Sequence, residues 1–287
     1  MIKETFYKDR PAVELSCDKF TATFLPKDGG KLASFKSNSG FEYLLQTEGE
    51  KYRRLDLAGD FEKSECSGFD DMFPTIDPCV VNGLNYLDHG EICRHEQIAE
   101  IDGDRLSLYC TMQNLNVFYK KTAYLKDDAL FVEYHIENLN NFDFQYLWAG
   151  HIMIKGEEGA YAFSNLDGTP RMIVSGQPVS EESAHILPPK IHNHYKFYYT
   201  NAKPYVKCGV VFPKSNTEIC VECDSDVVKY FGAWVNAGDL NGAYTIAIEP
   251  CTALFDDPIR AKKANAYYVI KAHDSVEFTL KMSYKTI

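Results

Sequence analysis

The sequence contains no long apolar run and no excess of basic residues. No segment approaches the roughly 18 consecutive apolar residues that cross a bilayer as a helix. Residues 1–10 mix charges of both signs, whereas a secretory signal needs an apolar stretch. Lys and Arg total 30 against 41 Asp and Glu, and the net charge of −11 repels polyanions such as nucleic acid. We therefore expect a cytoplasmic protein with neither a membrane nor a nucleic acid as its partner.

Metal and redox motifs are also missing. The nine cysteines are an odd number, and the single C-x-x-C, Cys220 to Cys223, has no second pair. Its two thiols would point to opposite faces of a strand and could not share a metal. His192 and His194 could face one side of a strand, with His185 nearby, but no carboxylate has a fitting spacing. We predict reduced thiols, no metal and no cofactor, and we interpret these histidines as part of a binding loop.

Helical periodicity is absent too, because no window of about a dozen residues has the 3.6-residue apolar repeat of an amphipathic helix. Alternating apolar and polar residues recur instead, separated by turn-forming stretches such as 27–30 and 239–242. No repeat or change in composition marks a domain boundary. We predict a single domain, residues 1–287, of the all-β class: a large antiparallel β-sandwich whose two sheets enclose the 14% of aromatic residues. The predicted strands are 20–25, 106–112, 118–125, 130–137, 144–154, 206–212, 228–235, 244–249, 267–272 and 276–284.

Two long segments, 49–78 and 166–204, break the regular spacing of strands and turns. The second mixes Gly, Pro, His and Ser with no clear period. Long loops inside a compact domain are usually functional or disordered. We therefore interpret both segments as long loops.

Two polar residues stand on strands that are otherwise largely apolar. In the segment 144–154, His151 shares one face with small residues such as Ala149, so there is room beside its ring. Glu249 ends the segment 244–249, and a carboxylate there is costly to bury unpaired. Two interpretations remain open at this point: a structural histidine with a salt-bridged glutamate, or two groups of an active site.

Polar turns supply further parts of a sugar site. The turn Asp88-His89-Gly90-Glu91 and the segment 68–74 place polar groups next to aromatic residues. Together with His151, Glu249 and the indole of Trp234, they provide carboxylates and imidazoles for hydroxyl groups and a flat apolar face for a pyranose. The pattern thus favours a carbohydrate ligand.

These residues, in this order, resemble the galactose mutarotase-like superfamily, which contains the aldose 1-epimerases and their relatives. The similarity covers most of the chain. It is carried by a glycine turn with its strand, a Gly-rich segment ending in Phe-Pro, a His-Gly motif, a strand with a second histidine, a late Trp strand and a Glu-Pro segment. In that order the segments are 25–35 followed by 41–45, then 68–74, 88–91, 148–151, 232–234 and 247–253.

The resemblance implies a β-supersandwich and a cofactor-free isomerase, an aldose 1-epimerase (mutarotase) that interconverts α and β anomers of a hexose or related sugar. In that reaction Glu249 would be the general base, His151 the general acid, and His89 a second imidazole near the ring oxygen. Glu249 must be ionised while His151 is protonated, and we expect their proximity to favour both charges. The predicted substrate contacts are Asp71, Glu91, Trp234 and Trp148.

The chain departs from the family pattern at two positions. Relatives commonly carry an arginine before the Gly-rich segment, where this chain reads Glu65-Cys66-Ser67-Gly68. The missing cation argues against a sugar phosphate, and the family's substrate-holding aspartate has no clear counterpart. The candidates are Arg53, Arg54, Arg94 or Arg171 for the cation, and Asp167 or Lys196 for the aspartate.

Two other functions stay open from the sequence. The same fold could hold a sugar without turning it over, which would make the chain a non-catalytic carbohydrate-binding protein. A glycosidase or lyase would need two carboxylates flanking the scissile bond, and Glu91 or Asp71 could stand beside Glu249. In each case the partner is a small-molecule sugar, and the sequence does not decide between a monomer and a homodimer.

Overall fold

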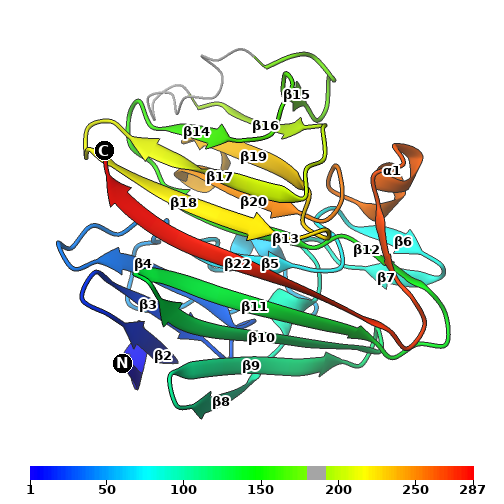
Figure 1. Ribbon diagram of the computed structural model, residues 1–287, viewed down its shortest axis with the longest axis horizontal. Coiled ribbons are helices and arrows are strands. Elements are labelled where there is room, and N and C mark those ends of the chain that lie inside the picture. Colours follow the sequence, from blue (N-terminus) through cyan, green and yellow to red (C-terminus); the bar gives the residue numbers. More distant parts are fainter. Residues whose placement is uncertain (180–191) are drawn as a thin grey trace.

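Two large antiparallel sheets dominate the computed structural model, which describes residues 1–179 and 192–287 (Figure 1). In spatial order, the ten-stranded sheet contains β1 (Ile2–Tyr7), β2 (Arg10–Ser16), β3 (Phe20–Leu25), β4 (Lys31–Ser37), β5 (Phe69–Met72), β13 (Ala149–Lys155), β20 (Tyr244–Cys251), β19 (Tyr230–Ala237), β16 (His194–Tyr199) and β15 (Arg171–Met172). The eight-stranded sheet contains β14 (Tyr161–Ser164), β17 (Tyr205–Phe212), β18 (Thr217–Asp224), β22 (Ser275–Thr286), β11 (Ala129–Asn138), β10 (Val117–Lys126), β9 (Arg105–Met112) and β8 (Ile98–Asp102). Two short pairs complete the sheets: β12 (Phe144–Tyr146) with β21 (Tyr268–Ile270), and β6 (Cys79–Val81) with β7 (Leu84–Tyr86).

Strand β11 shows why the alternating segments form sheets. Its even-numbered residues from Leu130 to Ile136 are buried, while Phe131, Glu133 and His135 between them are half-buried. Successive side chains of a strand point to opposite faces, so one face of β11 packs into the core. Because β11 pairs along its length with both β10 and β22, its backbone hydrogen bonds are satisfied on both sides.

The main core lies between the two large sheets and is rich in aromatic rings. Trp148 has no exposed surface, and its indole N–H donates to the Tyr119 hydroxyl at 3.0 Å. Its ring lies 4.7 Å from that of Phe278 and 5.0 Å from that of Tyr134, centroid to centroid. Buried aromatic rings each remove a large apolar area from water, so this cluster is a principal source of stability.

In residues 1–179 and 192–287, helical structure is confined to short pieces. The α-helix α1 (Pro258–Lys263) has six residues, and the Asp257 side chain caps it by accepting from the N–H groups of Ile259 and Arg260. Among the described residues, no helix is long and apolar enough to cross a membrane. The 3-10 turns are η1 (Phe61–Lys63), η2 (Ile92–Arg94) and η5 (Leu240–Gly242).

The all-β antiparallel sandwich predicted from the sequence is confirmed, and so are most of the predicted strands. The segment 144–154 is an exception, because it forms two strands, β12 and β13, in different sheets. Between them, the Leu147 N–H donates to the Pro74 carbonyl and the Trp148 N–H to the Thr252 hydroxyl. These bonds replace sheet pairing at the break.

The interpretation of 166–204 as a long loop is wrong for its described C-terminal part. Residues 194–199 form β16, which pairs with β19 in the ten-stranded sheet. The segment also contains β15, which pairs with β16. Strand β16 reads His-Tyr-Lys-Phe-Tyr-Tyr, and its polar and aromatic mixture hides the alternation that a half-buried strand usually shows.

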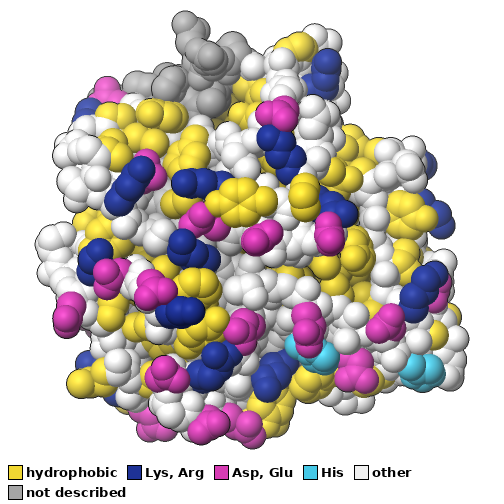
Figure 2. Space-filling model, viewed as in Figure 1, with side chains coloured by type: hydrophobic (Ala, Val, Ile, Leu, Met, Phe, Trp, Pro, Cys, Tyr) yellow, Lys and Arg dark blue, Asp and Glu magenta, His cyan; other side chains and the backbone are white. Residues whose placement is uncertain are grey.

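The outer face of the eight-stranded sheet carries charges of both signs, which Figure 2 shows as interspersed blue and magenta side chains. Cross-strand partners account for part of this pattern. Glu222 on β18 pairs with Lys281 on β22 at 2.8 Å, and Glu218 pairs with Lys285 at 3.1 Å. Such exposed pairs contribute little individually, but interspersed charges keep this face solvated.

The residues of interest on the ten-stranded sheet lie in two rows that cross its strands. The first row crosses β13, β20, β19 and β16 and consists of Met153, Ala247, Trp234 and Lys196. The second row lies two residues further along each strand, on the same face, and consists of His151, Glu249, Gly232 and Tyr198. The register of four paired strands therefore brings the two residues of interest, His151 and Glu249, side by side.

Candidate active site

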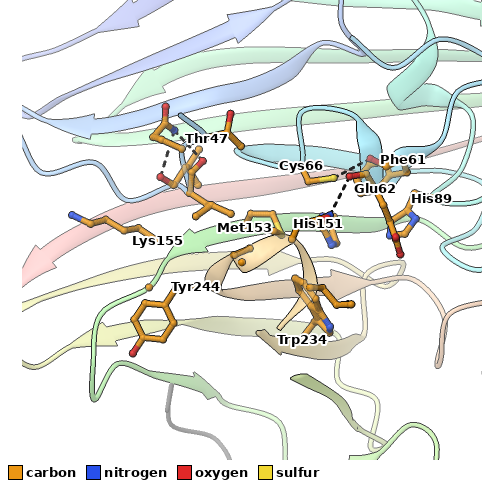
Figure 3. Close-up of a pocket in the computed structure, with 18 of the residues that line it drawn as sticks. Thr47, Phe61, Glu62, Cys66, His89, His151, Met153, Lys155, Trp234 and Tyr244 are labelled. Carbon is orange, nitrogen blue, oxygen red and sulfur yellow. Dashed lines mark hydrogen bonds between the residues drawn. The ribbon is translucent and has the colours of Figure 1, made fainter. Parts of the chain in front are cut away.

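A cleft of about 1180 Å³ lies over these rows of the ten-stranded sheet (Figure 3). His151, Met153 and Lys155 line it from one face of β13, and Trp234 lines it from β19. The turn that carries His89 and the 3-10 turn η1 also line the cleft, and the rings of His89 and Phe61 lie 5.8 and 6.0 Å from that of His151, centroid to centroid. The remaining polar or charged lining residues are Glu42, Gln46, Thr47, Glu48, Arg53, Glu62, Lys63, Asp77, Lys196, Asn241, Tyr244, Glu249 and Asp256.

Glu249 and His151 meet at the floor of this cleft. Glu249 has no exposed surface and His151 is 6% exposed. The His151 Nε2 atom lies 3.9 Å from Glu249 Oε1, while the His151 Nδ1 atom is buried with no hydrogen-bond partner. An unpaired buried nitrogen is uncommon in a folded protein, because it loses its bonds to water. The arrangement therefore marks this spot as a place where a polar ligand would bind.

Lys196 is the third charged group of the site. Its Nζ atom lies 2.5 Å from Glu249 Oε2 and 2.7 Å from Asp256 Oδ1, so one ammonium joins two carboxylates. The Tyr198 hydroxyl donates to the same Asp256 oxygen at 2.5 Å. A Cβ at Gly232 would come within 2.6 Å of the Tyr198 ring, so this glycine leaves the room that the tyrosine needs.

His89 is held in place by its turn. Its backbone has a φ of 56°, and the following Gly90 has a φ of 76° with no room for a Cβ beside the Phe73 backbone. Its ring stacks on Phe61 at 3.9 Å between centroids, with an interplanar angle of 3°. The Asp88 carboxylate lies 3.0 Å from His89 Nδ1. The ring is thus fixed before any ligand arrives.

Burial sets the ionisation of the pair at the floor. Burial lowers the pKa of His151 well below its ordinary value, and the positive charges of His89, Lys196 and Lys31 lower it further. Burial raises the pKa of Glu249; Lys196 counteracts this rise, and Asp256 adds to it. Both shifts run against the expectation that proximity would favour the charged forms, because burial is the largest cause of each.

Four of the predicted site residues, Glu249, His151, His89 and Trp234, line the same cleft. The structure does not bring Asp71 to it. Asp71 lies between the sheets, where it accepts from Lys121 Nζ at 2.6 Å and from the Tyr134 hydroxyl at 3.0 Å. Its neighbour on β5, Asp70, is paired with Lys31 at 2.9 Å. Asp71 is thus a buried structural carboxylate.

Glu91 and Trp148 also lie away from the cleft. Glu91 is buried at the start of η2 and contacts His95 Nε2 at 2.9 Å. Trp148 belongs to the core between the sheets. Because its side chain alternates with that of His151 along 144–154, the strand period already placed it on the opposite face. Neither residue lines the cleft.

Of the candidate replacements for the family's two missing side chains, Arg53 and Lys196 line the cleft. Arg94 is buried and donates to backbone carbonyls, among them those of Asp88 and Gly90, so it holds the His89 turn. Asp167 is exposed and pairs with Lys203 at 2.9 Å. Arg54 pairs with Glu96, and Arg171 donates to the Gly176 carbonyl.

The residues that carried a metal alternative are not clustered with carboxylates. Within residues 1–179 and 192–287, no three His, Cys, Asp or Glu side chains are placed to hold a metal ion. His192 Nδ1 lies 2.9 Å from the Gly238 carbonyl and His194 Nδ1 lies 2.7 Å from Asp239. Cys220 and Cys223 are buried thiols of β18. His185 lies outside the described residues.

The sequence did not reveal Asp256 and Tyr198 as parts of the site, and it did not reveal that Lys196 pairs with Glu249. Lys196 and Tyr198 fall on β16, within the segment interpreted as a loop. Asp256 follows the Glu-Pro segment by a few residues and has no motif of its own. The signal that could have found them is charge: a buried Glu249 required a cation, and Lys196 was already under consideration.

The fold of two large antiparallel sheets is shared with galactose mutarotase-like structures. No family model matches the sequence, and no curated protein matches it significantly. Solved structures match in fold. A protein from Synechocystis sp. PCC 6803 has a TM-score of 0.76 at 16% identity over 100% of both chains. A galactose mutarotase-like protein from Clostridium acetobutylicum scores 0.69 at 16% identity, covering 100% of this chain and 99% of its own.

A third structure comes from Klebsiella pneumoniae and is provisionally assigned as an aldose 1-epimerase. It matches with a TM-score of 0.78 at 14% identity, over 99% of this chain and 83% of its own. The chain is thus similar in fold to mutarotase-like proteins along its whole length. At these identities the likeness concerns the fold, and function has to be argued from the cleft.

Proposed function

We propose that the protein is an aldose mutarotase that interconverts the α and β anomers of a neutral hexose or a related sugar. The observation that carries the proposal is the pairing of buried Glu249 with His151 at 3.9 Å on the floor of a cleft, with the His89 ring 5.8 Å from that of His151, centroid to centroid. The fold similarity to mutarotase-like proteins supports it. The site supplies one carboxylate and two imidazoles around a space open to a ligand.

Ring opening requires one proton to leave the sugar and another to arrive. Glu249 takes the proton of the anomeric hydroxyl, the C1–O1 bond gains double-bond character, and the C1–O5 bond breaks. An imidazole donates a proton to O5 in the same step, so no full charge develops on either oxygen. His151 is the closer donor to Glu249, and His89 contacts the ring-oxygen side. After rotation about C1–C2, the reverse proton transfers close the ring as the other anomer.

Glu249 and His151 must carry opposite charges for this step, although burial favours the neutral form of each. A sugar that fills the cleft brings hydroxyl groups to both, and these replace the lost water as hydrogen-bond partners. Lys196 adds a fixed positive charge 2.5 Å from Glu249 Oε2, which favours the carboxylate form that a base requires.

The floor of the cleft suits the apolar face of a pyranose. Met153 and Trp234 both line the cleft, and Ala247 stands between them in the same row of the sheet. Trp234 is half-buried, so part of its ring faces the cleft. Sugar C–H groups pack against such apolar and aromatic surfaces while their hydroxyl groups meet the charged rim.

Polarimetry tests the proposal directly. Freshly dissolved α-D-glucose and α-D-galactose, followed by a wider panel of aldoses, should mutarotate faster with the wild-type protein. Glu249→Gln and His151→Ala should each lower this acceleration by about 10²-fold or more, as expected when an acid or base is removed. Asp167→Asn is the matched control, because Asp167 is an exposed carboxylate outside the cleft. Full activity in Glu249→Gln would reject the proposal.

One observation favours the second candidate, a non-catalytic carbohydrate-binding protein. In the free protein Lys196 already occupies Glu249 Oε2, and a carboxylate bound in this way is a weaker base. Calorimetric binding of a sugar, with anomer exchange at the background rate across the whole panel, would support that function. The hydrolase alternative loses its two sequence candidates, since Glu91 and Asp71 lie outside the cleft.

A further inference from the structure

The charge of Glu249 depends on groups from several elements that meet around it. Lys196 and Tyr198 face it from β16, and His151 faces it from β13. Cys251 ends β20, Asp256 follows that strand, and His89 belongs to a turn that lines the cleft. A carboxylate with no exposed surface takes up a proton unless a charge or hydrogen bonds compensate for its lost hydration. Lys196, at 2.5 Å, is the nearest cation.

The same lysine is shared with a second carboxylate. Lys196 Nζ lies 2.7 Å from Asp256 Oδ1, which also accepts from the Tyr198 hydroxyl at 2.5 Å. The lysine side chain is 11% exposed, and those of Glu249 and Asp256 are 1% and 8% exposed. One ammonium thus compensates two buried carboxylates. Whatever strengthens its contact with Asp256 weakens its hold on Glu249.

We propose that Lys196 and Asp256 are positioning residues that set the charge of Glu249 in opposite directions. Lys196 holds Glu249 as a carboxylate, ready to accept a proton. Asp256 draws part of the ammonium away, so that Glu249 is not bound too firmly to act as a base. Tyr198 fixes Asp256 in the place from which it competes. The catalytic consequence rests on the proposed mutarotase function, whereas the charge setting is a property of the free protein.

A general base needs this balance, because proton transfer is most efficient when the pKa of the base lies near the operating pH. With Lys196 alone, Glu249 would be a stable carboxylate and a weak base. With neither residue, it would be a protonated acid buried in the sheet. With Lys196 and Asp256 both present, the proton affinity of Glu249 lies between these limits. Lys196→Met should raise that affinity, and Asp256→Asn should lower it.

The experiment is a titration of the Glu249 side-chain carboxyl by ¹³C NMR in the free protein, with the resonance assigned by its loss in Glu249→Gln. In Lys196→Met the midpoint should rise by about one pH unit or more, since the nearest opposite charge is gone. In Asp256→Asn it should fall below the wild-type value. Lys196→Arg keeps the charge and should remain close to wild type. The opposite signs are the signature, because a general loss of packing would not produce them.

Tyr198→Phe provides a milder perturbation if Lys196→Met folds poorly. It removes one hydrogen bond from Asp256 and leaves all charges in place, so Asp256 draws Lys196 more strongly and the Glu249 midpoint should rise. Unchanged midpoints in Lys196→Met and Asp256→Asn, or shifts of the same sign, would overturn the inference. In the same variants, the acid limb of the kcat/KM profile for mutarotation should follow the NMR midpoint.

The two proposals fail separately. If no sugar shows accelerated anomer exchange but the NMR midpoints move in opposite directions, the mutarotase function is rejected and the charge-setting pair stands. If exchange is accelerated and lost in Glu249→Gln but the midpoints do not move, the function stands and the pair is rejected.

Discussion

At the scale of single residues, the site consists of charged side chains that the fold has almost removed from water. The side chains of Glu249, Lys196 and Asp256 are only 1%, 11% and 8% exposed. The pKa values of Glu249 and His151 are displaced in opposite senses, upward for the acid and downward for the imidazole. Both displacements favour neutral groups, so the active ionisation state has to be maintained by neighbours.

These directions predict the pH dependence of mutarotation. Below the raised pKa of Glu249 the base is protonated, and above the lowered pKa of His151 the acid has lost its proton, so the rate falls on both sides. The profile of kcat/KM against pH should therefore have both an acid limb and an alkaline limb. A rate that does not change with pH would contradict the assigned pair. His151→Ala, with its acid removed, should lose the alkaline limb together with most of the rate.

The Lys121–Asp71 pair is a second buried ion pair, and its role is stability. The two side chains are 3% and 0% exposed and their charged atoms lie 2.6 Å apart. Lys121→Met leaves Asp71 as an unpaired buried charge, so the free energy of unfolding should fall by about 3–5 kcal/mol. Urea unfolding measures this loss. Lys19→Met removes the exposed pair of Lys19 with Asp128 and serves as the control, with an expected change below about 1 kcal/mol. Equal losses of unfolding free energy in both variants would show that burial does not determine how much an ion pair contributes to stability.

At the scale of elements, β13 separates the core from the cleft within neighbouring residues. Ile152 faces the core between the sheets, whereas Met153 lines the cleft next to Ala247 of β20. Alternation along a strand makes this division unavoidable. One element therefore contributes to stability on one face and to ligand contact on the other.

A pair of adjacent substitutions tests this division. Ile152→Ala should lower the free energy of unfolding by about 2–5 kcal/mol, because it opens a cavity in the core, and should leave the KM of the folded fraction unchanged. Met153→Ala should raise the KM for the sugar with a smaller loss of stability. Chemical unfolding and polarimetric kinetics on the same samples give both quantities. The division would be refuted if Ile152→Ala changed the KM more than Met153→Ala did.

The sequence predicted the strands with strict alternation well, and it predicted the facing of His151 and Glu249. It missed strands in which the pattern of polar and apolar residues depends on where the strand lies in its sheet. Strand β8 is exposed along its length at a sheet edge, so it has no buried face to leave a period. Strand β16 lies between β15 and β19, and aromatic residues occur on both of its faces while its polar residues share one face with Tyr198. The failure at β16 hid the contact of Lys196 with Glu249, because a contact across paired strands cannot be derived without the register.

Substrate contacts were the weakest prediction, for a similar reason. Asp71 and Glu91 belong to segments that resemble motifs of the family, but membership of such a segment does not decide which side of a sheet a carboxylate faces. Asp71 turns inward to Lys121, and Glu91 contacts His95 beneath the turn. Trp148 could have been excluded from the sequence, because the strand period placed it opposite His151.

At the scale of the whole molecule, charge bears on the kind of sugar. The net charge is −11, and the cleft itself is lined by six carboxylates against four Lys and Arg side chains. Arg53, the arginine candidate that lines the cleft, is 56% exposed and lies 3.6 Å from Glu65. A phosphorylated sugar would therefore meet a field of its own sign with little local compensation.

We accordingly expect a neutral hexose to be preferred over its 6-phosphate. The kcat/KM for the phosphate should be lower by an order of magnitude or more, and the difference should shrink as salt screens the field. Polarimetry of both sugars at low and high ionic strength measures the two effects. Faster turnover of the phosphate at low salt would contradict this expectation and would point to Arg53, Lys63 or Lys155 as an anion-binding group.

The positions of the two tryptophans give the protein two optical reporters with different surroundings. Trp148 is sealed among Tyr119, Tyr134 and Phe278, so its fluorescence follows the integrity of the core. Trp234 lies at the edge of the cleft, so its emission responds to whatever displaces water there. Since the chain has no third tryptophan, Trp148→Phe leaves a single emitter at the cleft. Sugar occupancy can then be followed by light, without a coupled assay and whether or not the sugar is turned over.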